Sequence, residues 1–167
     1  MVKISHFSPL LHTEVPDTAA LLQTANLVVH PLVAQVTLHG SRGLNGRPRP
    51  DSDMDLSLLV ASSNPPIICN DLGKLFADMI SVTLNHWRSS VELDLAIVFP
   101  LRNCRLRCFQ FTQYVPSLCA GSGIDCFGIY KTQKGFSGFV QNAGIQVEKM
   151  YPCLTIWRKY HQTQWIV

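Results

Sequence analysis

The spacing of apolar residues predicts two amphipathic helices. The first begins at Pro16–Asp17, with Asp17 or Thr18 as its cap, and continues until Pro31 stops it. The second begins after Asn70 or Asp71. The apolar positions on their buried faces are Leu21, Leu22, Ala25, Val28 and Val29 in the first helix, and Leu72, Leu75, Phe76, Met79, Ile80 and Leu84 in the second.

Three strands are predicted around the second helix. Residues 35–39 alternate polar and apolar side chains, and residues 54–60 and 91–99 are largely apolar, the last run ending at Pro100. The element order is therefore helix, strand, loop, strand, helix, strand. This order predicts an α/β (α+β) fold with a mixed β-sheet flanked by helices.

The last third of the chain is less regular. Residues 126–131 and 153–157 are expected to be strands, and the glycine-containing segment 134–146 separates them. Residues 101–111 carry three arginines and are compatible with either a helix or a strand.

Length and composition favour one compact domain. The chain has 167 residues, of which 47% are apolar and 15% charged, as in a globular protein and unlike a disordered one. No linker separates two parts, so we expect a single domain over residues 1–167. Its core would span about residues 17–100, followed by a C-terminal extension over about residues 101–167.

Charge and cysteine content exclude some classes of protein. A formal net charge of +3 is compatible with binding nucleoside triphosphates but is too small for a dedicated nucleic-acid-binding module. The six cysteines form no CxxC pair and are expected to be buried reduced thiols. Without an apolar run of about 18 residues or a leader-like N-terminus, we expect a cytoplasmic protein that does not enter the membrane.

Candidate chemistry lies at the ends of the predicted strands. Gly40–Ser41 follows the strand 35–39, where a glycine lets the backbone approach a ligand and a hydroxyl can bind a phosphate oxygen. Asp53 and Asp55 begin the next strand, and residues two apart in a strand point to the same side. Two adjacent carboxylates repel each other unless cations lie between them, and Mg²⁺ prefers such oxygen ligands.

A third carboxylate is expected from the strand 91–99. Asp94 stands among apolar residues, where an acid is unfavourable without a partner. Glu92 lies on the same face and is the alternative third acid. A solvated acid on a half-exposed strand is the simpler interpretation of either residue alone.

Taken together, these motifs carry a family resemblance. The stretch from His39 to Val60, HGSRGLNGRPRPDSDMDLSLLV, resembles the signature of the DNA polymerase beta-type nucleotidyltransferase superfamily, especially its minimal and aminoglycoside nucleotidyltransferases. That signature is an apolar strand, Gly-Ser, a loop, and Asp-x-Asp on the next strand, with a later acid that matches Asp94. The resemblance covers roughly residues 34 to 99.

The resemblance implies a nucleotidyltransferase-like fold and an Mg²⁺-dependent transfer of a nucleoside monophosphate from ATP or another nucleoside triphosphate to a hydroxyl, releasing pyrophosphate. It implies that two Mg²⁺ ions are held by Asp53, Asp55 and Asp94, and that the nucleotide is bound by Gly40, Ser41, Arg42 and Ser52. The partner implied by the minimal group is a helical HEPN-type protein, as in toxin–antitoxin pairs. Separately from the resemblance, a homo-oligomer is an expected form of the chain. The alternatives are an aminoglycoside-like enzyme acting on small molecules, a non-catalytic binding module of the same fold, and a structural protein in which the motif is coincidental.

Overall fold

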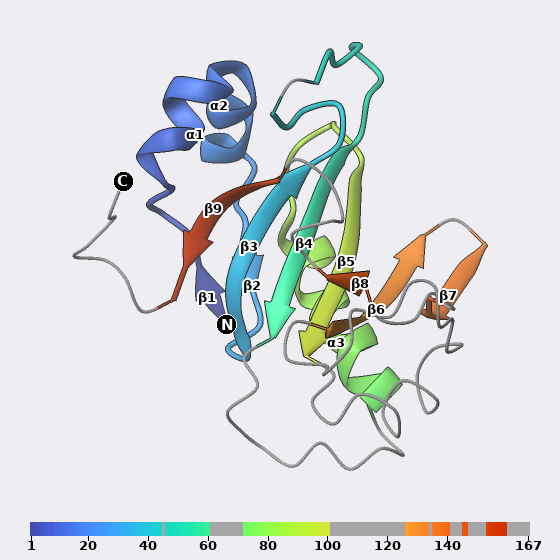
Figure 1. Cartoon of the computed structure of the whole chain (residues 1–167). Helices are drawn as coiled ribbons and strands as arrows, with labels where there is room; N and C mark the ends of the chain where they lie inside the picture. The colour runs from blue at the N-terminus through green and yellow to red at the C-terminus, as the bar shows by residue number, and fades with distance from the viewer. Residues whose placement is uncertain are drawn as a thin grey trace.

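The computed structural model describes residues 1–44, 46–60, 72–100, 126–133, 135–140, 145–146 and 153–159 (Figure 1). The described elements are three helices and nine strands in an α+β arrangement. Within these residues, no helix combines the length and the apolar character needed to cross a bilayer.

A seven-stranded mixed sheet forms the centre of the molecule (Figure 1). Its main path runs β7-β6-β5-β4-β3-β9, and β8 pairs with β6. The strands are β3 (Val33–His39), β4 (Met54–Val60), β5 (Leu93–Pro100), β6 (Cys126–Gln133), β7 (Phe136–Phe139), β8 (Ile145–Gln146) and β9 (Leu154–Arg158). The pair β4–β5 is parallel and the other pairs are antiparallel, which confirms the predicted mixed sheet.

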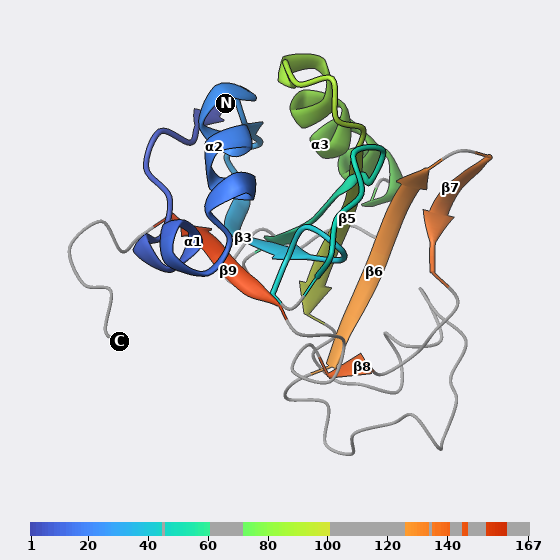
Figure 2. The ribbon, with the colours of Figure 1, turned by 90° about the horizontal axis from the view of Figure 1, so that it is seen from above.

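The remaining elements are α1 (Pro9–Glu14), α2 (Pro16–Thr24), α3 (Leu72–His86) and a two-stranded ribbon of β1 (Val2–Lys3) and β2 (Val28–Val29). Figure 2 shows α2 and α3 on the same side of the large sheet. The second predicted helix is confirmed as α3, while its cap lies outside the described residues.

The core lies between this helical layer and the sheet. In β4 every second residue is buried against it: Met54, Leu56, Leu58 and Val60. In α3, Phe76 is fully buried and contacts the aromatic rings of Phe99, Tyr130 and Phe139. The alternation of these apolar residues leaves the opposite face of β4 to the side chains of Asp55 and Ser57.

The first predicted helix is too long. The structure ends α2 at Thr24, and the chain turns at Asn26, which adopts a positive φ of 54°. Val28 and Val29 then pair with β1 instead of continuing the helix. β-branched residues favour a strand, and here strand pairing and burial outweigh the helical spacing of the two valines.

Other expectations differ in smaller ways. The strand expected at 35–39 begins at Val33, and the strand expected at 91–99 begins at Leu93. The segment 134–146 contains two short strands, β7 and β8. Residues 101–111 and the turn expected at 62–66 lie outside the described residues. Cys153 is a free thiol and is exposed at the start of β9, so the expectation of a buried thiol is wrong at this position.

Candidate metal centre

Strand register places three polar residues in one row across the sheet. His39 pairs with Asp55 in β3–β4, and Asp55 pairs with Asp94 in β4–β5. Met54 and Leu56, on either side of Asp55, are buried in the core. Because successive side chains alternate between faces, the polar row lies on the face opposite to that core.

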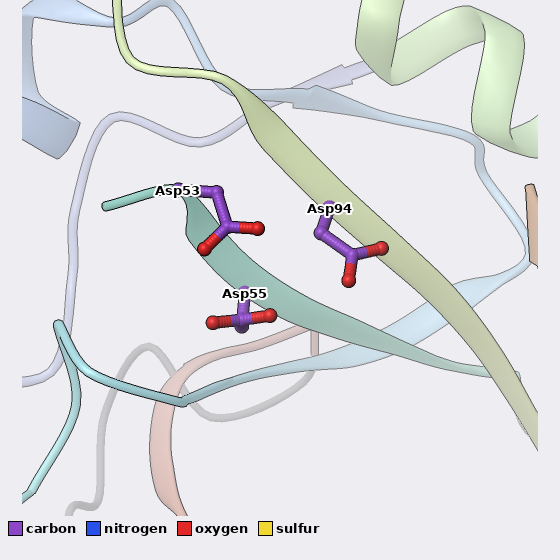
Figure 3. Close-up of side chains that lie close together, drawn as sticks. All are labelled: Asp53, Asp55 and Asp94. Carbon is purple, nitrogen blue, oxygen red and sulfur yellow. The ribbon is translucent and has the colours of Figure 1, made fainter. Parts of the chain in front are cut away.

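Three carboxylates converge at this row. Asp53, Asp55 and Asp94 each offer an oxygen that lies within 4.8 Å of the oxygens of the other two, a spacing that allows them to share a metal ion. Figure 3 shows the three side chains projecting toward one another from the starts of β4 and β5. Glu92 does not belong to this group, so within the described residues the third acid is Asp94. The three carboxylates meet because β4 and β5 are parallel and therefore begin at the same edge of the sheet.

The acid cluster is electrostatically unfavourable when no cation is bound. Burial, followed by the negative charges of Asp53 and Asp94, raises the pKa of Asp55 from 3.8 to about 6. The positive charge of Lys131 acts in the opposite direction. A carboxyl that holds its proton this strongly would gain from a nearby cation, as expected of a metal ligand.

Asp94 has one oxygen paired and one oxygen without a partner. Its Oδ2 accepts a hydrogen bond from Lys131 Nζ at 2.7 Å in a partly buried ion pair. Its Oδ1 is buried and has no hydrogen-bond partner among the described residues. A buried carboxylate oxygen without a donor is unfavourable unless a ligand satisfies it. This oxygen, in a set of three hard oxygen donors, therefore fits a divalent cation such as Mg²⁺.

Gly40 lies directly against the cluster. It adopts a positive φ of 71°, and a Cβ at this position would be only 1.9 Å from Asp55 Oδ2. Both the backbone conformation and the space require glycine. In the structure the group that the Gly40 backbone approaches is the Asp55 carboxylate, and the expected approach of this backbone to a ligand stays a prediction.

The loop between β3 and β4 is closed by its own polar groups. Arg42 Nε donates to the backbone carbonyl of Ser52 at 2.9 Å, and its Nη2 donates to the carbonyls of Arg49 and Pro50 at 3.5 Å. Ser52 Oγ accepts from the Arg49 amide at 2.9 Å. Arg42 and Ser52 thus hold the loop in shape. Their predicted contacts with a nucleotide, like that of the half-buried Ser41, stay predictions.

Sequence reasoning missed Lys131 as a site residue. The strand expected at 126–131 continues to Gln133 in β6, and the Lys131 side chain is only 28% exposed. Its position between Tyr130 and Thr132 in a strand does give it a defined face. However, only the pairing of β6 with β5 shows that Asp94 lies on that face, and the sequence does not reveal this pairing.

Ser57 contacts His39, the end of the polar row on β3. His39 Nε2 and Ser57 Oγ are 2.7 Å apart and form a hydrogen bond. Burial lowers the pKa of His39, and the nearby charge of Lys131 lowers it further, so the ring is neutral at pH 7. His39 therefore does not offset the negative charge of the cluster.

Comparison with known proteins gave no match to this chain among family models, curated proteins or solved structures.

Proposed function

We propose that this protein is an Mg²⁺-dependent nucleotidyltransferase with a nucleotidyltransferase-like fold. It would transfer a nucleoside monophosphate from a nucleoside triphosphate, ATP being the expected one, to a hydroxyl group. The observation that carries the proposal is the convergence of Asp53, Asp55 and Asp94 at the starts of two parallel strands, beside the glycine that follows the preceding strand. The same elements form the family signature to which the sequence is similar.

Asp53, Asp55 and Asp94 would hold the metal, and the proposal includes two Mg²⁺ ions during the reaction. Bound Mg²⁺ would lower the pKa of the acceptor hydroxyl and neutralise charge that develops on the α-phosphate and on the departing pyrophosphate. Asp55 on β4, Asp53 directly before this strand and Asp94 on the parallel β5 suit this role, since all three present oxygen ligands at one edge of the sheet.

Other residues of the chain would position the reactants. Gly40 and Ser41 would contact the terminal phosphates, and Arg42 would keep the loop that carries them closed. Asp94 would orient the acceptor hydroxyl and accept its proton. The hydroxyl oxygen then forms a bond to the α-phosphorus, and the bond from this phosphorus to the pyrophosphate oxygen breaks.

The proposed acceptor is a hydroxyl on a protein, and the proposed partner is a helical HEPN-type protein, as for the minimal nucleotidyltransferases. The second candidate is an aminoglycoside-like enzyme acting on small molecules, which has the same acid cluster. A self-associated form and a location in the cytoplasm remain part of the proposal.

The test is pyrophosphate release from ATP and Mg²⁺ in the presence of a cell extract that supplies acceptors, with labelled ATP to reveal the product. Asp53→Asn should lower turnover by about a hundredfold or more, because it removes one of the metal ligands. The control is Asp78→Asn, which changes an exposed aspartate on α3. Equal turnover of Asp53→Asn and the control would refute the assignment. Thermal stabilisation by ATP and Mg²⁺ without pyrophosphate release would favour the non-catalytic binding module.

A further inference from the structure

The ion pair between Lys131 and Asp94 joins β6 to the acid cluster. Lys131 Nζ lies 2.7 Å from Asp94 Oδ2, and the two side chains are 28% and 17% exposed. Ion pairs on the surface contribute little, whereas this pair is partly withdrawn from solvent, so its charges are screened less. Lys131 therefore acts on the same half-buried space in which the three carboxylates meet.

The charges around this space are not balanced. The three carboxylates contribute −3 when ionised and Lys131 contributes +1, which leaves −2. His39 directs its Nε2 to Ser57 Oγ rather than to the carboxylates of the cluster. Arg42 directs its guanidinium to backbone carbonyls of its own loop. Among the residues that the structure describes, Lys131 is the cation that forms an ion pair with the cluster.

We propose that Lys131 is a built-in counter-cation of the acid cluster, and that its positive charge weakens the binding of a divalent ion when no nucleotide is present. The inference rests on the cation-binding part of the proposed function and does not depend on the transfer reaction.

Two effects of Lys131 act in the same direction. It occupies Asp94 Oδ2, so that Oδ1 is the oxygen left for a metal. Its ammonium also repels a second cation across a few ångströms of partly buried space, where the effective dielectric constant is well below that of water. Removing the charge should therefore tighten the binding of a divalent ion by about tenfold or more.

The experiment measures the dissociation constant of Mn²⁺ without nucleotide, from the electron paramagnetic resonance signal of free Mn²⁺. Lys131→Met removes both the charge and the donor. Lys131→Gln keeps a hydrogen-bond donor for Asp94 without the charge, and it replaces Lys131→Met if that variant fails to fold. Lys131→Arg keeps the charge. Lys74→Met removes an exposed lysine on α3 and is the matched control for a change in net charge.

The expected result is tighter Mn²⁺ binding by Lys131→Met and Lys131→Gln, and wild-type affinity for Lys131→Arg and Lys74→Met. Unchanged or weaker binding by the two uncharged variants would overturn the inference, since Lys131 would then only hold Asp94 in place. Undetectable binding by the wild type and by every variant would overturn both this inference and the metal site. Tighter binding as expected, together with no pyrophosphate release, would overturn the proposed function alone.

Discussion

Replacing Asp55 with asparagine removes one of three clustered negative charges while it keeps the shape of the side chain. The ordinary pKa of the carboxyl is 3.8, and burial together with Asp53 and Asp94 raises it to about 6 in the folded protein. At about 1.4 kcal/mol per pKa unit, this shift corresponds to about 3 kcal/mol. Because Asp55 is only half-buried, solvent screening reduces the effect on the free energy of unfolding to about 1–2 kcal/mol.

The sign of the change in stability with pH follows from the number of protons that the folded and unfolded states bind. Between pH 4 and pH 6, roughly, the folded wild type holds a proton on Asp55 that the unfolded chain has released, so the stability of the wild type falls as the pH rises through this window. The loss is complete above the folded pKa. Asp55→Asn does not titrate and is therefore expected to be more stable than the metal-free wild type above pH 6, with a melting temperature higher by roughly 3–6 °C.

Urea unfolding in the presence of a chelator, repeated at several pH values, measures this difference. Asp78→Asn is again the control for the loss of an exposed aspartate. Adding Mg²⁺ should stabilise the wild type more than Asp55→Asn, and so reduce or reverse the difference between their free energies of unfolding. The reasoning would be refuted by a metal-free Asp55→Asn that is less stable than the wild type at pH 7.5, or by a stability gap that does not change between pH 4 and pH 6.

Two further substitutions test the loop that borders the cluster. Gly40→Ala should destabilise the protein and weaken Mn²⁺ binding, because the new Cβ would displace the Asp55 carboxylate. The control is Gly135→Ala, at a glycine that also has a positive φ but has open space where the Cβ would lie. This variant should retain the Mn²⁺ affinity of the wild type. Similar Mn²⁺ affinities of the two variants in a titration would contradict the close contact at Gly40. Arg42→Ala should lower the free energy of unfolding by about 1–2 kcal/mol through lost hydrogen bonds to the loop carbonyls, against about 0.5 kcal/mol or less for the exposed Arg47→Ala. Equal urea midpoints for the two arginine variants would show that the loop does not depend on Arg42.

Local patterns predicted the elements whose burial is regular. The bounds of β4 were predicted as residues 54–60, because an apolar side chain at every second position marks a strand that is buried on one face. Because residues two apart in a strand point the same way, this pattern also predicts that Asp53 and Asp55 project from the same face of the sheet. Asp94 is predicted on the later strand 91–99. The sequence therefore predicted the composition of the acid cluster, apart from the choice between Glu92 and Asp94.

Features that depend on distant parts of the chain were not predicted. Val28 and Val29 fit a helical face but form a strand, because the first residues of the chain offer a pairing partner. Lys131 reaches Asp94 because β6 pairs with β5, a contact between residues 37 positions apart in the sequence. Hydrophobic spacing carries no information on which strands become neighbours, so these contacts had to come from the structure.

The parallel register of β4 and β5 makes the acid cluster depend on the packing of the core. A slip of β5 by a single residue would turn Asp94 inward among the leucines and turn Leu95, which is fully buried, toward the polar row. The apolar residues that forbid this slip thereby also align the carboxylates, although they never touch a ligand. Substitutions in the hydrophobic layer could consequently abolish cation binding while every acidic residue is retained.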